Sequence, residues 1–307
     1  MVSINETRRY HRYYPIDLMT EFTISESLSS VNSPYMMALE DPKPYGAMIG
    51  DVLKAKNMLK TGFRVCEIGG GYGNLMRGLL EAYSSTIGHV YMVDLSMFLL
   101  KKQRRTLEAW NHLTTFIHAD ATELIPVISG VDLIIINEVI GDFDTYKDVE
   151  RRNLPGQISR LVNQYALDIP DEGLFNFNVG AISIVEEICK KGIPVFISEH
   201  SSDPIIPRDM EFLEKGLEID SFPREIKLTE HSEFTVRFSH LVKVAKYWDR
   251  NVSTGSLIDL VGLKKSSKMR FIFISRACGT DEQEIIFELL DHIREYTWLI
   301  IKGSSPD

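Results

Sequence analysis

Short apolar runs alternate with amphipathic stretches between residues 45 and 138, and this alternation constrains the fold more than any other feature of the chain. Four β-rich runs (63–68, 89–94, 114–120, 131–138) are interleaved with three segments of helical spacing (45–59, 73–83, 97–110). Strands that alternate with helices at this interval predict repeated βαβ units. The last run has an unbroken apolar stretch, which suits a strand covered on both faces. We therefore predict an α/β fold with a doubly wound, mostly parallel sheet.

The rest of the chain is less regular. We expect two helices (179–192 and within 232–249), a strand at 193–200, a short helix at 254–263, a strand at 269–275 and a C-terminal helix at 281–300. Polar stretches near 141–176 and 201–230 are expected to be helical or irregular insertions that shape an acceptor site. Residues 1–45 lack strand–helix alternation, so they are predicted to be an N-terminal extension to a domain spanning 46–307.

A glycine-rich turn, VCEIGGGYGN (65–74), follows the first predicted strand. A dinucleotide-binding GxGxxG motif would place Asn74 at its third glycine, and a P-loop requires a Gly-Lys-Ser/Thr sequence that is absent here. The spacing of Glu67, Gly69, Gly71 and Gly73 instead fits the ExGxGxG loop of S-adenosylmethionine (SAM) methyltransferases. A carboxylate repels a pyrophosphate but is compatible with the ammonium and sulfonium of SAM. A glycine turn without a ligand is the remaining alternative.

Acidic residues end the second and third predicted strands. Asp94, followed by Leu95, is placed to accept hydrogen bonds from ribose hydroxyls, as in NAD enzymes, although it could instead cap the next helix in competition with Ser96. Asp120, followed by Ala121, occupies the position at which an acid in methyltransferases often meets the adenine amino group. An ordinary turn aspartate is the alternative there. We predict that the Asp94–Leu95 and Asp120–Ala121 pairs contact the cofactor.

Polar residues also end the fourth and fifth predicted strands. Asn137 and Glu138 should face the crevice beside the transferable methyl group, with Asn137 also contacting the cofactor. Glu138 is suited to pair with a cationic acceptor or to accept a proton, unless it only caps the following turn. His200, beside Glu199 and Asp203, is a candidate general base, although a loop histidine is more often only hydrogen-bonded.

Other polar groups are weaker candidates. His231, with Glu230 and Glu233, is a second possible base. Acidic residues of the first insertion are expected to be solvated rather than to bind a divalent metal: Asp142, Asp144 and Asp148. The three cysteines are widely spaced and form no CxxC pattern, so no metal site is predicted.

Taken together, residues 46–200 resemble a class I SAM-dependent methyltransferase. Three segments are also similar to the MidA-like group, which is related to mitochondrial complex I assembly factors: VDLSMFLLKKQRRTL (93–107), INEVIGDF (136–143) and LTEHSEFTVRFSHLVKVA (228–245). The chain departs from that group at 141–144, where Gly-Asp-Phe-Asp replaces the expected Asp-Ala-Leu-Pro-like run. The MidA-like resemblance implies methylation of a protein arginine.

The net charge and the distribution of apolar residues limit the kinds of partner and location that we expect for this protein. A net charge of -9 argues against broad nucleic-acid binding, which requires a basic surface. The N-terminus lacks a signal-peptide pattern and no stretch reaches 18 apolar residues, so we expect a cytoplasmic protein without a membrane span. The predicted activity is transfer of a methyl group from SAM to a nitrogen or oxygen of a small-molecule or protein acceptor. A non-catalytic SAM-binding assembly factor and, less favoured, an NAD-dependent oxidoreductase are the alternatives. The oligomeric state is left open.

Overall fold

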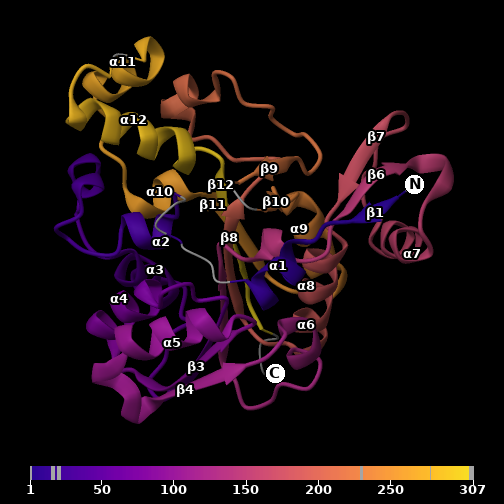
Figure 1. Cartoon of the computed structure of the whole chain (residues 1–307), viewed down its shortest axis with the longest axis horizontal. Coiled ribbons are helices and arrows are strands. Elements are labelled where there is room, and N and C mark those ends of the chain that lie inside the picture. Colours follow the sequence, from indigo (N-terminus) through magenta and orange to yellow (C-terminus); the bar gives the residue numbers. More distant parts are fainter. Residues whose placement is uncertain (1, 15–17, 19–21, 229–230, 277, 304–307) are drawn as a thin grey trace.

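The computed structural model describes residues 2–14, 18, 22–228, 231–276 and 278–303. A seven-stranded sheet runs through its centre in the order β11-β12-β8-β5-β2-β3-β4 (Figure 1). In chain order its strands are β2 Phe63–Ile68, β3 Ile87–Asp94, β4 Thr114–His118, β5 Leu133–Asn137, β8 Val195–His200, β11 Val252–Ser256 and β12 Tyr296–Ile301. Within this sheet β12 runs antiparallel to both of its neighbours, and the other strands are parallel to one another. The predicted doubly wound, mostly parallel sheet is confirmed.

Helices cover both faces of the sheet. They are α3 Tyr45–Ala55, α4 Asn74–Tyr83, α5 Met97–Thr106, α6 Ala121–Leu124, α8 Val179–Lys191, α9 Phe238–Tyr247, α10 Leu257–Val261 and α12 Asp281–Ile293. Helix α11 Ser267–Ser275 packs on α12 instead. Alternate residues of β5 enter separate cores: Ile135 packs with α3, α4 and α12, whereas Ile134 and Ile136 pack with α8 and α9. This two-sided burial explains why β5 lacks polar alternation.

The glycine at position 46 sets how closely α3 and α4 pack. A Cβ atom at Gly46 would lie 1.8 Å from the carbonyl oxygen of Leu75. The α3 helix therefore approaches the α4 backbone at a distance that only glycine permits, which anchors the helix directly behind the glycine-rich turn.

The predicted strand at 269–275 is wrong, because these residues lie in helix α11. The side chain of Ser266 caps this helix by accepting a hydrogen bond from the backbone N–H of Met269. Met269, Ile272 and Phe273 are buried at helical spacing. A short apolar run is compatible with either a strand or a helix, and here the cap and the packing against α12 decide for the helix.

Two further boundaries differ from the prediction. The segment 254–263 begins with strand β11, and helix α10 starts at Leu257. The predicted C-terminal helix ends at Ile293, and the chain then turns into β12. Pairing with β8 and β11 satisfies the backbone of β12 on both sides, and this tertiary gain overrides the local helical pattern.

The N-terminal residues and the first insertion form a second, small sheet with the order β1-β6-β7. Its strands are β1 Ser3–Ile4, β6 Tyr146–Glu150 and β7 Leu174–Phe177, and the insertion also contains helix α7 Gly156–Tyr165. The second insertion and the segment after it contain the hairpin of β9 Glu225–Lys227 and β10 Ser232–Phe234. The N-terminal helices α1 Thr7–Tyr13 and α2 Ile24–Ser27 lie near the carboxyl ends of the central strands (Figure 1). Short 3-10 helices complete the chain: η2 Pro34–Ala38, η3 Glu108–Leu113, η4 Ile140–Asp142, η5 Arg151–Asn153 and η6 Arg208–Glu214.

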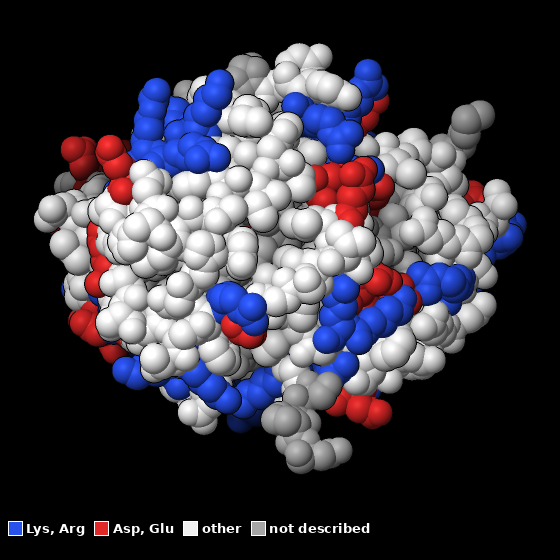
Figure 2. Space-filling view, turned by 90° about the horizontal axis from the view of Figure 1, so that it is seen from below, with Lys and Arg blue, Asp and Glu red and all other residues white. Residues whose placement is uncertain are grey.

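Throughout the described part of the chain, every helix is too short or too polar to cross a bilayer. On the face seen in Figure 2, groups of Lys and Arg side chains are interspersed with groups of Asp and Glu. The cytoplasmic location and the lack of broad nucleic-acid binding stay predictions.

Candidate active site

A cavity of about 580 Å³ opens at the carboxyl ends of β2, β3, β5 and β8. Ligand sites in open α/β sheets lie at this edge, and the volume falls within the usual range of about 300–1,000 Å³ for small-molecule sites. Residues from α1, from α2 and from the β9–β10 hairpin also line the cavity. The cavity therefore has one wall made of sheet edges and another made of segments distant in sequence.

The glycine-rich turn forms part of the first wall. Gly69, Gly71 and Gly73 have φ angles of 66°, 51° and 87°, in the left-handed region that favours glycine. Gly69 and Gly71 line the cavity, whereas Gly73 is at the N-cap of α4 and packs against Gln103. A Cβ atom on Gly71 would lie 3.0 Å from Leu18 Cδ1. The turn thus brings backbone to the cavity at Gly69 and Gly71.

Glu67 lies behind this turn. It is the penultimate residue of β2, only 2% exposed, and it is not one of the described residues that line the cavity. Burial raises the pKa of its carboxyl to about 8, and the neighbouring Asp94 adds to the rise. The structure does not bring Glu67 or Gly73 to the cavity wall, so their assignment as cofactor contacts stays a prediction.

Asp94 reaches the cavity from the end of β3 with its carboxylate already oriented. Its Oδ1 accepts from the backbone N–H of Ser96 at 2.8 Å and its Oδ2 from Gln103 Nε2 at 2.8 Å. Gln103 Nε2 also lies 3.1 Å from the carbonyl oxygen of Gly71, so one side chain joins the acid to the glycine turn. Burial raises the pKa of Asp94 to about 6. Because a carboxylate has about four lone-pair sites, Asp94 retains acceptor capacity toward the cavity.

The cap of α5 comes from the Ser96 side chain, which accepts from the N–H of Leu99, and not from Asp94. Leu95 also lines the cavity. Gln103 is not among the predicted site residues, although it lies in segment 93–107, which is similar to the MidA-like group. The alternative role considered for Asp94, capping α5, is therefore filled by Ser96.

Asp120 and Ala121 line the cavity beyond β4. Asp120 Oδ1 accepts from the backbone N–H and the hydroxyl of Thr122, which caps α6. Its Oδ2 accepts from Arg12 Nη2 of the N-terminal helix at 2.8 Å, and Arg8 Nη1 lies 3.8 Å away. The predicted adenine contact is therefore in a salt bridge with the N-terminal segment.

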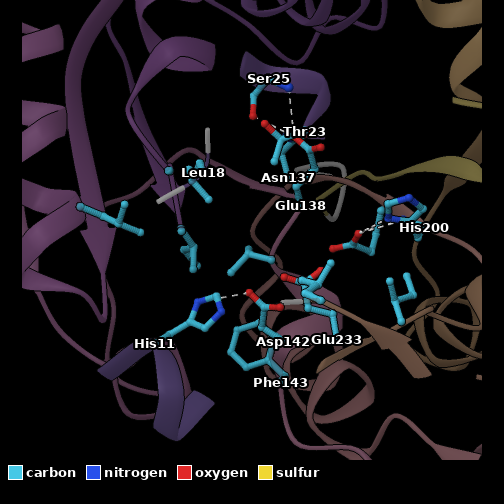
Figure 3. Close-up of a pocket in the computed structure, with 18 of the residues that line it drawn as sticks. His11, Leu18, Thr23, Ser25, Asn137, Glu138, Asp142, Phe143, His200 and Glu233 are labelled. Carbon is cyan, nitrogen blue, oxygen red and sulfur yellow. Dashed lines mark hydrogen bonds and ion pairs between the residues drawn. The ribbon is translucent and has the colours of Figure 1, made fainter. Parts of the chain in front are cut away.

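Glu138 is surrounded by hydrogen-bond donors (Figure 3). Oε1 accepts from the N–H of Ile24 at 2.6 Å and from the Tyr296 hydroxyl at 2.8 Å. Oε2 accepts from the N–H and hydroxyl of Ser25 and from Asn137 Nδ2. The φ angle of Glu138 is 54°, a left-handed conformation that a non-glycine residue rarely adopts. Strained backbone conformations of this kind are often found at functional sites. Glu138 thus fastens α2 to the end of β5.

Asn137 is itself held by buried groups. Its Oδ1 accepts from the Tyr45 hydroxyl at 3.0 Å and from Ser198 Oγ at 2.7 Å. Since its Nδ2 donates to the adjacent Glu138, the amide orientation is fixed by this residue together with Tyr45 on α3 and Ser198 on β8. Asn137 and Glu138 both line the cavity, and their roles toward the cofactor and the acceptor stay predictions.

His200 lines the cavity at the end of β8. Its Nδ1 lies 3.6 Å from Glu199 Oε1, and its ring centroid lies 4.1 Å from that of Tyr296. Burial alone would lower the pKa of His200, but the Glu199 carboxylate raises it overall. This favours the imidazolium, which is unsuited to accept a proton until it loses its own. The role of His200 as a general base stays a prediction.

A histidine from the N-terminal helix, missed at the sequence level, completes the second wall. His11 Nε2 lies 3.3 Å from His231 Nε2, which in turn lies 3.3 Å from Glu233 Oε1. Burial lowers the pKa of His11 to about 4. No spacing rule could join residues 11 and 231, which are 220 positions apart. Glu230, the other predicted neighbour of His231, is outside the described residues.

The acids of the first insertion do not gather into one group. Asp142 lines the cavity and its Oδ2 lies 3.6 Å from His11 Nδ1, whereas Asp144 Oδ1 lies 3.5 Å from Arg8 Nε. Asp148 has a left-handed φ of 53° within β6. The absence of a metal at these acids stays a prediction.

The cavity is rich in acids. Among the described residues that line it are nine carboxyl groups and three Lys or Arg side chains. Several of these acids form ion pairs, such as Asp120 with Arg12 and Glu295 with Arg224. Carboxyl groups still outnumber the basic side chains of the lining threefold. Such a surface attracts cations and disfavours a polyanion such as a pyrophosphate.

Comparison with known proteins agrees with this geometry. Residues 65–163 match a family model described as a methyltransferase domain. The chain has a class I methyltransferase fold. The matched segment begins in β2 and ends in α7, so it contains the glycine turn, Asp94, Asp120, Asn137 and Glu138.

Solved structures share this methyltransferase fold. A COG1565 superfamily protein from Burkholderia thailandensis is 15% identical, with a TM-score of 0.56 over 98% of this chain and 88% of that one. A COG1565 superfamily member from the same organism, bound to S-adenosyl-homocysteine, is 14% identical, with a TM-score of 0.53 over 92% of this chain and 79% of that one. A search of curated proteins finds no match. The predicted resemblance to class I methyltransferases is confirmed, and the two structures support the MidA-like resemblance at the level of fold.

Proposed function

We propose that this protein is a SAM-dependent methyltransferase that modifies a nitrogen or oxygen of a cationic acceptor, with a protein arginine as the leading candidate. The observation that carries the proposal is the excess of carboxyl groups around a cavity at the carboxyl edge of a methyltransferase sheet. SAM, when bound, supplies a methyl group already activated by its sulfonium. The protein then has to bind, orient and exclude water, and positioning accounts for much of the acceleration.

The residues of the first wall fit this cofactor. Gly69 and Gly71 present backbone without side chains, and Asp94 offers acceptor sites to ribose hydroxyls. Asp120 offers a carboxylate for an amino group such as that of adenine. The acid-rich lining is compatible with the positive charges of SAM. A dinucleotide would instead have to place its pyrophosphate among carboxylates, which disfavours the NAD alternative.

The acceptor side is the region around Asn137, Glu138 and His200. Glu138 is suited to hold a guanidinium through two parallel hydrogen bonds if its present donors exchange. A guanidinium must lose a proton as its nitrogen becomes methylated, and carboxylates near Glu138 are suited to accept it. MidA-like proteins, which the chain resembles, provide the reason to favour arginine over other cationic acceptors.

One observation favours a second candidate function. Glu138 already accepts five hydrogen bonds from within the protein, so the acceptor side is closed in this arrangement. A SAM-binding assembly factor that transfers no methyl group would need no accessible carboxylate there.

Titration with SAM and NADH, followed by incubation of the protein with methyl-labelled SAM and cell extract, distinguishes the candidates. We expect SAM binding, no NADH binding and labelled methylarginine after hydrolysis. SAM binding without any transfer would favour the assembly factor.

Glu138→Gln should keep SAM affinity and lower methyl transfer at least about tenfold, which is about 1.4 kcal/mol in the barrier. The substitution removes the charge that would recognise a cation. It also weakens the attachment of α2, so two controls are needed. Ser25→Ala and Tyr296→Phe each remove one donor to Glu138 without changing its charge. Transfer should fall far less in these variants when all are assayed at saturating SAM. Because Ser25 is in α2 and Tyr296 is in β12, equal losses in all three would show that Glu138 acts only by holding these two elements in place.

A further inference from the structure

The second wall of the cavity holds a cluster that the proposed function does not use. His11 on α1, His231 just before β10 and Glu233 within β10 each bring one possible ligand atom close to those of the other two. These atoms, two imidazole Nε2 and one carboxylate oxygen, all lie within 4.8 Å of one another. Figure 3 shows His11 and Glu233 on the opposite side of the cavity from Ser25 and Glu138.

The spacing of the donors suits a metal ion better than a hydrogen-bond chain. A tetrahedral ion with bonds of about 2.0–2.1 Å holds its donor atoms about 3.3–3.4 Å apart. The distances from His231 Nε2 to His11 Nε2 and to Glu233 Oε1 are both 3.3 Å. A hydrogen-bond chain would need one proton on His231 Nε2 to serve two acceptors, each beyond the usual 2.7–3.2 Å.

The surroundings orient both imidazoles. Asp142 Oδ2 lies 3.6 Å from His11 Nδ1, whereas the other ring nitrogen, Nε2, lies 3.3 Å from His231 Nε2. A carboxylate in that place favours the proton on Nδ1 and leaves the Nε2 lone pair for a metal, as in many histidine metal sites. The His231 ring is stacked on Tyr10, with centroids 4.6 Å apart and planes inclined by 9°. The hydroxyl of Thr7 donates to the carbonyl oxygen of Ser232, so α1 and β10 are joined beside the cluster.

We propose that His11, His231 and Glu233 bind a divalent transition-metal ion of the zinc class, with a fourth coordination position open to the cavity. Two imidazoles select zinc-like ions over Mg²⁺ and Ca²⁺, which prefer all-oxygen sites. Three protein ligands with an open position are typical of sites that bind a ligand, whereas structural zinc sites have four. His11 and Glu233 both line the cavity, so an oxygen or nitrogen of an acceptor can take the open position. The metal site does not depend on whether methyl transfer occurs.

The full chain, stripped of metal by a chelator and dialysed, should be titrated with CoCl₂ and then with ZnCl₂. Tetrahedral Co²⁺ gives an intense visible absorption that octahedral Co²⁺ in water lacks. We expect one equivalent of Co²⁺ to bind with this spectrum and to be displaced by Zn²⁺. Failure of both ions to bind, or only the weak octahedral spectrum, would overturn the proposal.

Variants locate the ion. His11→Gln, His231→Gln and Glu233→Gln should each weaken Zn²⁺ binding at least about 100-fold, and Asp142→Asn about tenfold as a residue outside the ligand set. His112→Gln, at an exposed histidine on η3, is the matched control and should bind like the parent protein. Far-UV circular dichroism checks that each variant is folded. If His231→Gln does not fold, His11→Gln decides, since it changes the N-terminal helix alone. Unchanged binding in His11→Gln and Glu233→Gln would refute the assignment.

Discussion

The two walls of the cavity are built in different ways. The first wall, which we call the cofactor wall, is built from consecutive βα units, and its residues lie between Gly69 and Glu138 in the sequence. The second wall lies opposite it. The opposite wall is assembled from both ends of the chain: α1 and α2 contact residues more than 100 positions away, as Ile24 contacts Glu138 and Thr7 contacts Ser232. A local motif can specify the first wall, whereas the second exists only after the sheet has formed. The cofactor wall should therefore tolerate few substitutions, and their effects on SAM affinity should be additive. Substitutions in the opposite wall should change ligand binding and the free energy of unfolding together.

Gly71→Val is the most damaging change that we expect on the cofactor wall. A β-branched residue at a φ of 51° is strained by about 1–3 kcal/mol, and its side chain would enter the cavity beside Leu18. SAM affinity measured by calorimetry should fall at least about 100-fold, or about 2.8 kcal/mol. Gly216→Val is the matched control, because Gly216 has a φ of +81° with open space around it and lies away from the cavity. If both variants bind SAM equally well, the glycine turn does not form the cofactor wall.

Glu67→Gln tests the cost of the acid buried behind the turn. Burial raises the pKa of Glu67 in the folded protein to about 8, above its ordinary value of 4.5. The folded state therefore holds a proton that the unfolded state releases, and the free energy of unfolding falls as pH rises from about 5 to about 9. We expect Glu67 to account for about 2–4 kcal/mol of this fall. Urea denaturation of both proteins at the two pH values should show the smaller fall in Glu67→Gln. Equal slopes would mean that Glu67 ionises normally.

Asp94→Ala should weaken SAM binding by about 1–3 kcal/mol, the range for a lost hydrogen bond to a charged group. The expected loss is smaller than for Gly71→Val because the cavity keeps its shape. Asp132→Ala is the matched control: Asp132 flanks β5 at the other edge of the sheet and pairs with Arg64. Calorimetric titration of both variants at one salt concentration gives the comparison. An unchanged affinity in Asp94→Ala would remove this acid from the cofactor wall.

The same contrast explains what the sequence could predict. Strand β2 was predicted at its observed residues, since a buried apolar run followed by glycines is a local signal. Gly69, Gly71, Asp94, Leu95, Asp120 and Ala121 were predicted as cofactor contacts and do line the cavity. Their placement follows from one rule, that the residues at the carboxyl ends of parallel strands meet at one edge of the sheet.

The errors have a common physical origin. Helix α12 passes into β12 across Arg294 and Glu295, with no glycine or proline to mark the boundary, and only the pairing with β8 and β11 defines the strand. The hydrogen bonds from Ile24 and Ser25 to Glu138 span more than 110 positions, beyond the reach of any local pattern. The residues 1–45 were therefore expected to be an extension, although α1 and α2 form part of the cavity wall.

Arg12→Ala tests the point where the two walls meet, and its expected effect is the smallest. Arg12 is 41% exposed on its side chain and pairs with Asp120 Oδ2 at 2.8 Å, so the ion pair contributes at most about 1 kcal/mol. If Asp120 contacts adenine, the amino group of adenine competes with Arg12 for Oδ2 of Asp120. Removing Arg12 should then raise SAM affinity up to about fivefold, and the gain should shrink at high salt as the ion pair in the parent protein weakens. Arg9→Ala, at an exposed arginine on the same helix, is the control. An unchanged affinity would show that Asp120 does not receive the cofactor, and a weaker one would place Arg12 itself on the cofactor wall.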